Sequence, residues 1–242
     1  MAVPELVGHR GYPRRFPENT LVSIEGAIAA GGRYVEVDVQ LTRDLVPVLF
    51  HDENIRRVCG MEGTVSHYTF EELRRFPASE PGRFGTRYAH ERIPALTELA
   101  TLLARRPDVT AFIELKREAL NSFGVEAVLT RVVRDLQPVQ TQCVLISFVL
   151  EALTAAKRAG WRVGAVIEHW RERKQKTLQA LAPEFLFCDV NGLSWWGKLR
   201  FPGAKVAIYE VDDAETARKL AARGADLIET FAIGELRTAL GG

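Results

Sequence analysis

The sequence predicts an α/β protein, a closed (β/α)8 TIM barrel that forms a single domain over residues 1–242, with a hairpin excursion after the second strand. Short apolar segments alternate with helical patterns along the chain, which is typical of a parallel sheet covered by helices. Eight such strand segments fit a barrel of about 250 residues. An open doubly wound sheet is the alternative, but no G-x-G-x-x-G turn follows the first strand.

Each predicted strand is a run of apolar or β-branched residues, at residues 3–7, 34–39, 111–115, 143–147, 163–167, 185–190, 205–209 and 226–230. Helices with apolar residues on one face are expected at about residues 20–30, 96–105, 125–136, 150–158, 177–181, 214–223 and 233–240. Asn19 is expected to cap the first helix, which Gly31-Gly32 ends. Gly160 and Gly224 stand where helix C-caps belong.

One further apolar segment, Val46–Phe50, does not fit the count of eight. It follows the second strand after a few residues, whereas parallel neighbours need a crossover of about a dozen residues or more. We therefore expect it to fold back as a hairpin on the second strand, with His51 roughly opposite Glu36. Residues 52–92 then form an excursion within the domain, with one helical segment near Phe70–Phe76.

The composition argues against several classes of protein. The formal net charge is +1 and no cluster of Lys and Arg with interleaved aromatic residues is present, so no nucleic-acid partner is expected. No run approaches the ~18 apolar residues of a membrane span, and the N-terminus does not resemble a signal peptide. Three cysteines without a C-x-x-C pair predict neither a disulfide framework nor a zinc site, which favours a cytoplasmic location.

Charged and imidazole side chains gather at the ends of neighbouring predicted strands. They are His9 and Arg10 after the first strand, Glu36 and Asp38 in the second, Glu114 and Lys116 in the third, and His51 and Asp52 after the hairpin. Two residues spaced two apart in a strand share one face. Because active sites of (β/α)8 barrels lie at the carboxyl ends of the strands, we expect these side chains to meet there.

Three converging carboxylates repel one another unless a cation lies between them. All-oxygen ligation by Glu36, Asp38 and Glu114 suits one hard divalent cation, Mg²⁺ or Ca²⁺. Arg10 and Lys116 add fixed positive charge beside it, an arrangement that recognises an anion such as phosphate. Taken singly, each residue has an ordinary explanation as a salt bridge, a turn or a solvated strand face; the joint pattern favours a site.

The ordered motifs GHRG, PENT, YVEVDVQLTRD, PVLFHDENIRRVCG, ELK and SF resemble those of the glycerophosphodiester phosphodiesterase family, of the short bacterial cytoplasmic type. The similarity is dense from Val7 to Gly60 and becomes patchy after Phe148. No single tripeptide is specific, but the ordered set is. The resemblance implies a (β/α)8 barrel with a hairpin excursion, a small-molecule phosphodiester substrate and a place in lipid metabolism.

The resemblance also implies the role of each site residue. It assigns metal ligation to Glu36, Asp38 and Glu114, acid/base catalysis to His9 and His51, and phosphate contacts to Arg10 and Lys116. Glu18 and Asn19 match family positions near the metal. The implied reaction is metal-dependent hydrolysis of a glycerophosphodiester to glycerol 3-phosphate and an alcohol, in which one histidine takes a proton and the other protonates the leaving alkoxide.

The last third of the chain departs from the family pattern. Tyr209-Glu210-Val211-Asp212 stands where the family has a Trp-Thr-Val-Asn-like run, and Glu229-Thr230 stands where it has Thr-Asp. Glu210 thus adds a negative charge where the family has a neutral hydroxyl, which bears on the glycerol preference more than on the phosphodiester chemistry. The expected substrate mouth comprises Phe148, Trp195, Trp196 and Tyr209.

Three other functions remain open on the sequence alone. A lysophospholipase D-like or sphingomyelinase D-like enzyme would act on a single-chain lipid, and the aromatic pair Trp195-Trp196 together with the changed mouth favours it. A non-catalytic phosphoester-binding barrel would not need the intact His9 and His51. A carbon–carbon lyase on the same type of barrel would act on oxo acids and would need no second histidine.

Overall fold

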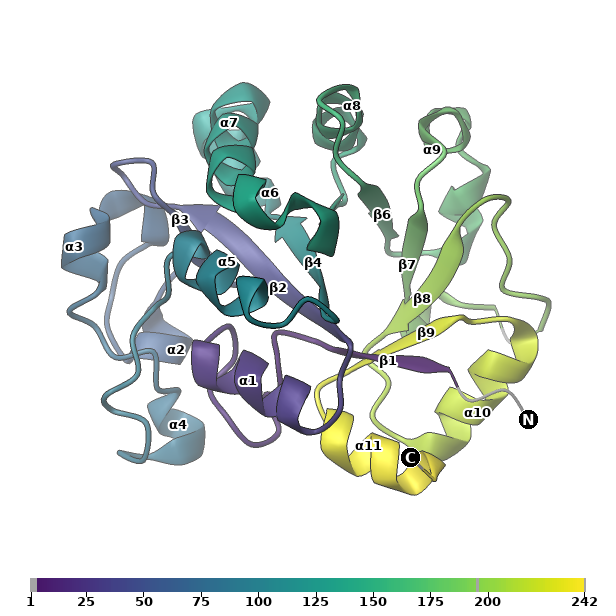
Figure 1. Ribbon diagram of the computed structural model, residues 1–242, viewed down its shortest axis with the longest axis horizontal. Helices are drawn as coiled ribbons and strands as arrows, with labels where there is room; N and C mark the ends of the chain where they lie inside the picture. Colours follow the sequence, from purple (N-terminus) through teal and green to yellow (C-terminus); the bar gives the residue numbers. More distant parts are fainter. Residues whose placement is uncertain (1–3, 195, 242) are drawn as a thin grey trace.

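The computed structural model describes residues 4–194 and 196–241, and its strands close into a barrel (Figure 1). The sheet order is β1-β9-β8-β7-β6-β5-β4-β2-β3, and a pairing of β1 with β2 closes the ring. The barrel strands, all parallel, are β1 (Glu5–Gly8), β2 (Tyr34–Leu41), β4 (Thr110–Leu115), β5 (Cys143–Ser147), β6 (Val163–Ile167), β7 (Phe185–Asp189), β8 (Lys205–Tyr209) and β9 (Leu227–Thr230). The predicted (β/α)8 barrel is confirmed.

Helices surround the strands in Figure 1. Those outside the excursion are α1 (Leu21–Ala29), α5 (Leu96–Ala104), α6 (Arg117–Phe123), α7 (Val125–Leu136), α8 (Leu150–Arg158), α9 (Lys176–Leu181), α10 (Ala214–Arg223) and α11 (Ile233–Leu240). Of these only α6 was not predicted. No helix in the described ranges is both long and apolar enough to span a bilayer.

The excursion lies to one side of the barrel, at the left of Figure 1. It contains more helix than expected: α2 (Arg56–Cys59), the 3-10 turn η1 (Val65–His67), α3 (Phe70–Leu73) and α4 (Pro81–Phe84). These short elements close over a core of their own, which includes Phe50, Ile55 and Leu73. The excursion therefore packs as a compact flap beside the hairpin.

The hairpin strand β3 (Pro47–Leu49) pairs antiparallel with β2, as predicted. Val39 pairs with Leu49, and the backbone N–H of Phe50 donates to the carbonyl of Asp38. Continued to His51, this register places it opposite Val37. The prediction had placed it roughly opposite Glu36, so the difference is one residue. The small shift still returns His51 to the carboxyl half of the barrel.

The first helix begins differently from the prediction. Its N-cap is Thr20, whose hydroxyl accepts from the backbone N–H of Ser23 at 3.3 Å. Asn19 has a positive φ of 54° and turns its side chain into the barrel instead. Gly224 is the left-handed C-cap of α10, as predicted, whereas the C-cap of α8 is Ala159, one residue before Gly160.

The barrel interior changes from apolar to polar along the strands. Its lower layers are filled by side chains such as Phe112, Phe185 and Phe187, whose rings pack edge to face. Side chains alternate between the two faces of a strand, so residues two apart share a face. Phe112 points into the barrel, and Glu114 and Lys116 therefore point inward as well. The interior is therefore closed by a packed apolar floor, and the polar residues lie above it.

Candidate active site

The carboxyl ends of the strands surround a cavity of about 300 Å³. Most of the predicted site residues line it, together with acidic residues from the later strands: His9, Arg10, Asp38, His51, Glu114, Lys116, Phe148, Glu168, Asp189, Tyr209, Glu210 and Glu229. Glu36 lies next to this lining and is 2% exposed. The fold thus brings together groups that are more than 200 residues apart in the chain.

Three carboxylates form an acidic cluster at the base of the cavity. Glu36, Asp38 and Glu114 each place one oxygen within 4.8 Å of the others, because Asp38 and Glu114 are direct partners in the pairing of β2 with β4. Oε1 of Glu36 is buried without a hydrogen-bond partner among the described residues. A buried hydrogen-bond acceptor without a donor is energetically costly, and a bound hard cation would remove that cost. The cluster also offers only carboxylate oxygens, the ligands that such a cation prefers.

The three carboxylates differ in their electrostatics. Burial, and then the charge of Asp38, raises the pKa of Glu36 well above its ordinary value and also raises the pKa of Glu114. Burial alone would raise the pKa of Asp38 too, but Arg10 and Lys116 outweigh it and hold that pKa below its ordinary range. Asp38 is therefore the anionic member of the cluster, whereas burial and the charge of Asp38 outweigh the nearby cations at the two glutamates.

Arg10 is placed by an unusual turn directly after β1. Its φ is 55°, and its backbone N–H donates to Oε2 of Glu36 at 3.0 Å. Its guanidinium lies between two acids, with Nε 3.2 Å from Oδ2 of Asp38 and NH1 3.1 Å from Oε1 of Glu18. Because both sides of the group are held, its position is fixed before any ligand arrives.

Lys116 follows β4 and faces the same cluster. Its Nζ is 3.1 Å from Oε1 of Glu114 and 3.4 Å from Oδ1 of Asp38. Burial opposes its charge, but those two carboxylates raise the pKa of Lys116 above its ordinary value. It is therefore a fixed cation at the wall of the cavity.

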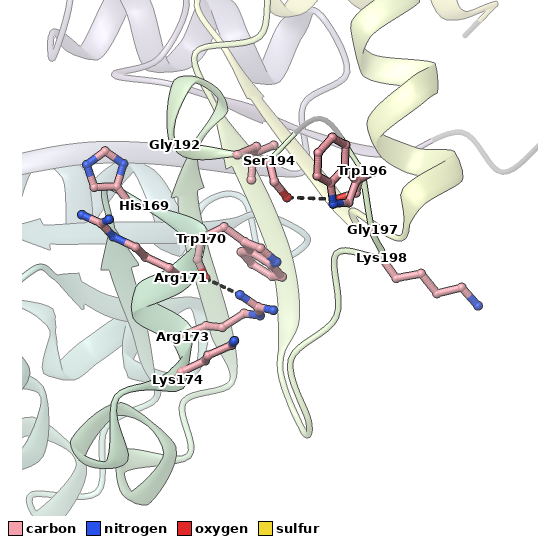
Figure 2. Close-up of a pocket in the computed structure, with 11 residues that line it drawn as sticks. His169, Trp170, Arg171, Arg173, Lys174, Gly192, Ser194, Trp196, Gly197 and Lys198 are labelled. Carbon is pink, nitrogen blue, oxygen red and sulfur yellow. Dashed lines mark hydrogen bonds between the residues drawn. The ribbon is translucent and has the colours of Figure 1, made fainter.

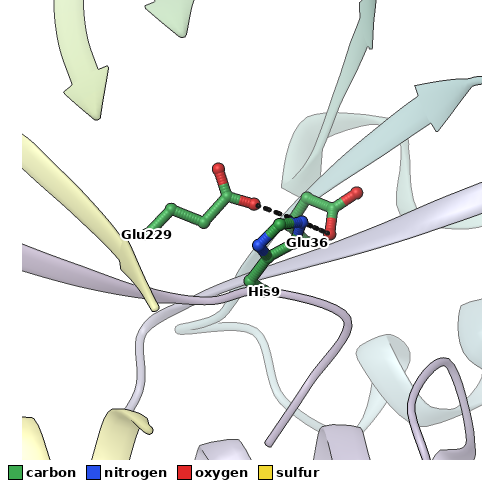
Figure 3. A group of neighbouring side chains, drawn as sticks. All are labelled: His9, Glu36 and Glu229. Carbon is green, nitrogen blue, oxygen red and sulfur yellow. Dashed lines mark ion pairs between the residues drawn. The ribbon is translucent and has the colours of Figure 1, made fainter. Parts of the chain in front are cut away.

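His9 is buried between two acids from opposite sides of the barrel seam (Figure 3). Its Nε2 is 3.9 Å from Oε2 of Glu36 and 3.7 Å from Oε1 of Glu229, and its ring stacks on Phe231 with centroids 4.4 Å apart. Burial, and then the charge of Arg10, lowers the pKa of His9 well below its ordinary value. His9 is therefore neutral at neutral pH and can accept a proton.

His51 is oriented by a chain of charged groups. Its Nδ1 lies 2.8 Å from Oδ1 of Asp52, and Oδ2 of Asp52 accepts from Nε of Arg57 at 2.7 Å. Burial would raise the pKa of Asp52, but His51 and Arg57 hold it below its ordinary range. Because an ionised Asp52 only accepts, Nδ1 of His51 donates the proton in this pair, and Nε2 is left for the cavity.

Glu229, which the sequence analysis named only as a departure from the family pattern, lies inside the site. It is 3% exposed and lines the cavity, and together with His9 and Glu36 it forms a second group whose ligand atoms lie within 4.8 Å of one another. Its pKa is raised well above the ordinary value by burial and then by Glu114. In the sequence, Glu229 stands two residues after Leu227, whose side chain packs in the barrel core. This spacing indicates that Glu229 also points into the barrel.

The predicted aromatic mouth is only partly assembled. Phe148 and Tyr209 line the cavity. Trp196 does not; it is 80% exposed and lines a neighbouring cleft of about 610 Å³ (Figure 2). The other wall of that cleft is basic and belongs to η3 (Trp170–Lys174). Trp195 lies outside the described residues.

The fold and the cavity define a class of protein, the (β/α)8 barrels that carry a polar site at the carboxyl ends of their strands. Comparison with known sequences identifies the family. The profile of the glycerophosphoryl diester phosphodiesterase family matches residues 9–184, and the chain belongs to that family.

Among the curated relatives that are similar to this chain are two bacterial enzymes. A glycerophosphodiester phosphodiesterase from Caldanaerobacter subterraneus is 29% identical over 232 residues, which cover 93% of each chain. One from Bacillus altitudinis is 37% identical over 122 residues, and the match spans about half of each chain, 50% of this one and 49% of that one.

Solved structures show the same fold. An Oleispira antarctica phosphodiesterase in complex with the product sn-glycerol-3-phosphate superposes with a TM-score of 0.84 at 26% identity, over 99% of this chain and 98% of that one. A putative glycerophosphoryl diester phosphodiesterase from Silicibacter pomeroyi also has a TM-score of 0.84, at 24% identity, over 99% of this chain and 93% of that one.

Proposed function

We propose that the protein hydrolyses glycerophosphodiesters to glycerol 3-phosphate and an alcohol, and that the reaction needs one divalent cation, Mg²⁺ or Ca²⁺. The observation that carries this proposal is the cluster of Glu36, Asp38 and Glu114, with ligand oxygens within 4.8 Å of one another beside two histidines. The Oleispira antarctica phosphodiesterase, solved with sn-glycerol-3-phosphate as its product, supports the same substrate class.

Glu36, Asp38 and Glu114 are the residues that would hold the cation. All three offer carboxylate oxygens, the donors that Mg²⁺ and Ca²⁺ prefer, and the unpartnered Oε1 of Glu36 fits a ligand position. When bound, such an ion supplies positive charge that stabilises the oxygens of a phosphoryl group.

Arg10 and Lys116 bind and orient the phosphate. Each is held at close to 3 Å by carboxylates, Arg10 by Glu18 at 3.1 Å and Lys116 by Glu114 at 3.1 Å. Donors that are fixed before the substrate binds need no reorganisation as charge develops on the phosphoryl oxygens, which is how enzymes obtain most electrostatic stabilisation.

His9 and His51 move the protons. His9 is neutral, and Nε2 of His51 is free because Asp52 holds its Nδ1. One ring removes a proton from the attacking group, and the other protonates the leaving alkoxide. The attacking group is either water or the 2-hydroxyl of glycerol, and in the second case water then hydrolyses the cyclic phosphate to glycerol 3-phosphate. Each transfer is typically worth about 10²–10⁴-fold in rate.

A panel of phosphodiesters tests the proposal. Glycerophosphodiesters, a lysophospholipid and a sphingomyelin are each incubated with Mg²⁺, Ca²⁺ or a chelator, and release of glycerol 3-phosphate and of the free alcohol is measured. We expect release from the glycerophosphodiesters that stops with chelator and returns with the cation. Turnover of only the lipids would instead support the lysophospholipase D-like or sphingomyelinase D-like alternative. Trp196, one of the residues that suggested this alternative, lines the neighbouring cleft and not the cavity.

The proposed location is the cytoplasm. Cys59, Cys143 and Cys188 are all free and buried, and burial raises the pKa of each thiol to about 12. Thiols of this kind are inert and behave as small core residues. Their state is compatible with a reducing compartment.

A further inference from the structure

The cleft of about 610 Å³ beside the catalytic cavity is strongly basic. Its lining contains no carboxylate and four fixed cations, Arg171, Arg173, Lys174 and Lys198. The chain as a whole is balanced, with 32 Lys and Arg against 31 Asp and Glu, so the excess of positive charge is local. None of the four cations forms an ion pair within residues 4–194 and 196–241. They are therefore available to an anionic partner from outside the protein.

The acidic residues that are close in sequence do not neutralise the cleft. Glu172 caps η3, because its Oε1 accepts from the backbone N–H of His169 at 2.8 Å. Glu168 lines the catalytic cavity instead, and it pairs with NH1 of Arg117 at 3.4 Å. The segment Trp170–Lys174 therefore presents its cations to the cleft without their acidic neighbours.

Trp196 projects from the other wall of the cleft (Figure 2). It is 80% exposed, whereas Met61, the other exposed large apolar residue of the described ranges, is 44% exposed. The backbone on both sides of Trp196 is held by Arg223 of α10, which donates to the carbonyls of Ser194 at 2.8 Å and Gly197 at 3.0 Å. A single exposed apolar residue needs no explanation, but an indole held beside four unpaired cations is typical of surfaces that bind membranes.

The cleft and the catalytic cavity adjoin at the carboxyl ends of two strands. After β6, Glu168 lines the cavity and the next residue, His169, lines the cleft. After β7, Asp189 lines the cavity and Gly192 lines the cleft. A flat surface that covered the cleft would therefore lie beside the mouth of the cavity.

We propose that this cleft docks the protein on the surface of an anionic phospholipid membrane, with Arg171, Lys174 and Lys198 among the lipid phosphates and Trp196 inserted between the headgroups. Lys and Arg are attracted to the negative surface of the cytoplasmic leaflet, and indole rings prefer the boundary between water and hydrocarbon. Single-stranded nucleic acid fits less well, because successive bases stack on several rings. Trp196 is the one exposed Trp, Tyr or Phe in the described lining.

Docking of this kind is peripheral and does not depend on the proposed function, although the two are compatible. A glycerophosphodiester is a phospholipid without its acyl chains, so hydrolysis of those acyl esters at the membrane is the class of reaction that supplies it. A cavity mouth held at the membrane surface lies where that product is released.

Vesicle binding tests the proposal. The full chain is mixed with vesicles of phosphatidylcholine alone, or of phosphatidylcholine and phosphatidylglycerol in equal amounts, and bound protein is separated by flotation. Chelator is present throughout, so that Ca²⁺ does not bridge the acidic cavity to the lipid. We expect the partition coefficient to be at least about tenfold higher for the anionic vesicles and to fall as salt is added, because several cations act together and salt screens them.

Variants locate the binding surface. Arg171→Gln and Lys174→Gln should each lower the partition coefficient for anionic vesicles about fivefold, the usual contribution of one cation near such a surface. Trp196→Ala should lower it at high salt as well, because the indole contribution is not electrostatic. Arg105→Gln changes the net charge equally at an exposed position after α5, at the amino end of the barrel, and should bind like the unaltered protein.

The outcomes are separate from those for the proposed function. No binding to anionic vesicles, equal binding to both kinds of vesicle, or binding that Arg171→Gln and Lys174→Gln leave unchanged would overturn the inference. Binding of a single-stranded oligonucleotide or of inorganic phosphate at the cleft, without binding to vesicles, would overturn it too. Arg171 and Lys174 do not line the catalytic cavity, so both variants should turn over a soluble glycerophosphodiester normally when no vesicles are present.

Discussion

Asn19 and Asp38 exchange two hydrogen bonds across the barrel seam. Nδ2 of Asn19 donates to Oδ2 of Asp38 at 2.9 Å, and the backbone N–H of Asp38 donates to Oδ1 of Asn19 at 3.1 Å. Arg10 and Lys116 contact the same carboxylate. Asp38 is therefore the most constrained member of the acidic cluster, and Asn19 orients it from outside the cavity.

Asn19→Ala should weaken binding of Ca²⁺ or Mg²⁺ by about 10–100-fold, the usual effect of losing a group that orients a metal ligand. The helix should persist, because its cap is Thr20. Titration calorimetry measures the affinity, and circular dichroism checks the fold. Asn121→Ala, at an exposed position in α6, is the matched control. An affinity equal to that of the control would remove Asn19 from the site.

Glu36→Gln, Asp38→Asn and Glu114→Gln should each weaken cation binding and abolish activity. Each change removes an anionic oxygen from the cluster but nearly preserves shape, so loss of the ligand is separated from loss of packing. Calorimetric titration and glycerol 3-phosphate release are the two measurements. Near-normal affinity in all three variants would show that the cation binds elsewhere.

His9→Ala and His51→Ala should each lower kcat by at least about 10² while the protein remains folded. The reason is that His9 lies over the acidic cluster and His51 presents Nε2 to the same cavity. The control is His67→Ala, an exposed histidine of η1. Unchanged turnover in either variant would exclude that ring from proton transfer.

Cation affinity should rise with pH. The carboxyl groups of Glu36 and Glu114 have pKa values raised above 4.5, so protons compete with the cation until pH exceeds those raised values. In the cation-free protein the same shifts favour the folded state below pH 4.5, and that contribution is lost as pH rises through the folded-state pKa. Ca²⁺ titrations at mildly acidic and at neutral pH measure the effect; a dissociation constant independent of pH would contradict it.

Phe112→Ala should lower the free energy of unfolding by about 3–5 kcal/mol, the usual effect of such a truncation in a core. Phe112 is fully buried in the barrel floor, where its ring lies 4.9 Å from those of both Phe185 and Phe187. Denaturant unfolding is the measurement. Trp196→Ala, at a residue that is 80% exposed, should change stability by less than about 0.5 kcal/mol.

The sequence alone determined the elements and the inward-facing acids. The ranges expected for β5, β6, β8, α7, α8, α10 and α11 agree with the structure residue for residue. The hairpin followed from the short link between β2 and β3, and the convergence of Glu36, Asp38 and Glu114 followed from a spacing of two residues. These features are local: the period of the hydrophobic pattern and the length of a connection are written in neighbouring residues.

Tertiary structure alone decided the partners of those residues. Asn19 occupied a plausible cap position, yet its side chain pairs with Asp38, because barrel closure brings the loop after β1 beside β2. Trp196 was expected at the mouth but lines the next cleft, and Glu229 meets His9 only because β9 pairs with β1. Such contacts depend on the register between strands that are distant in the chain, and no local period encodes a distance through space.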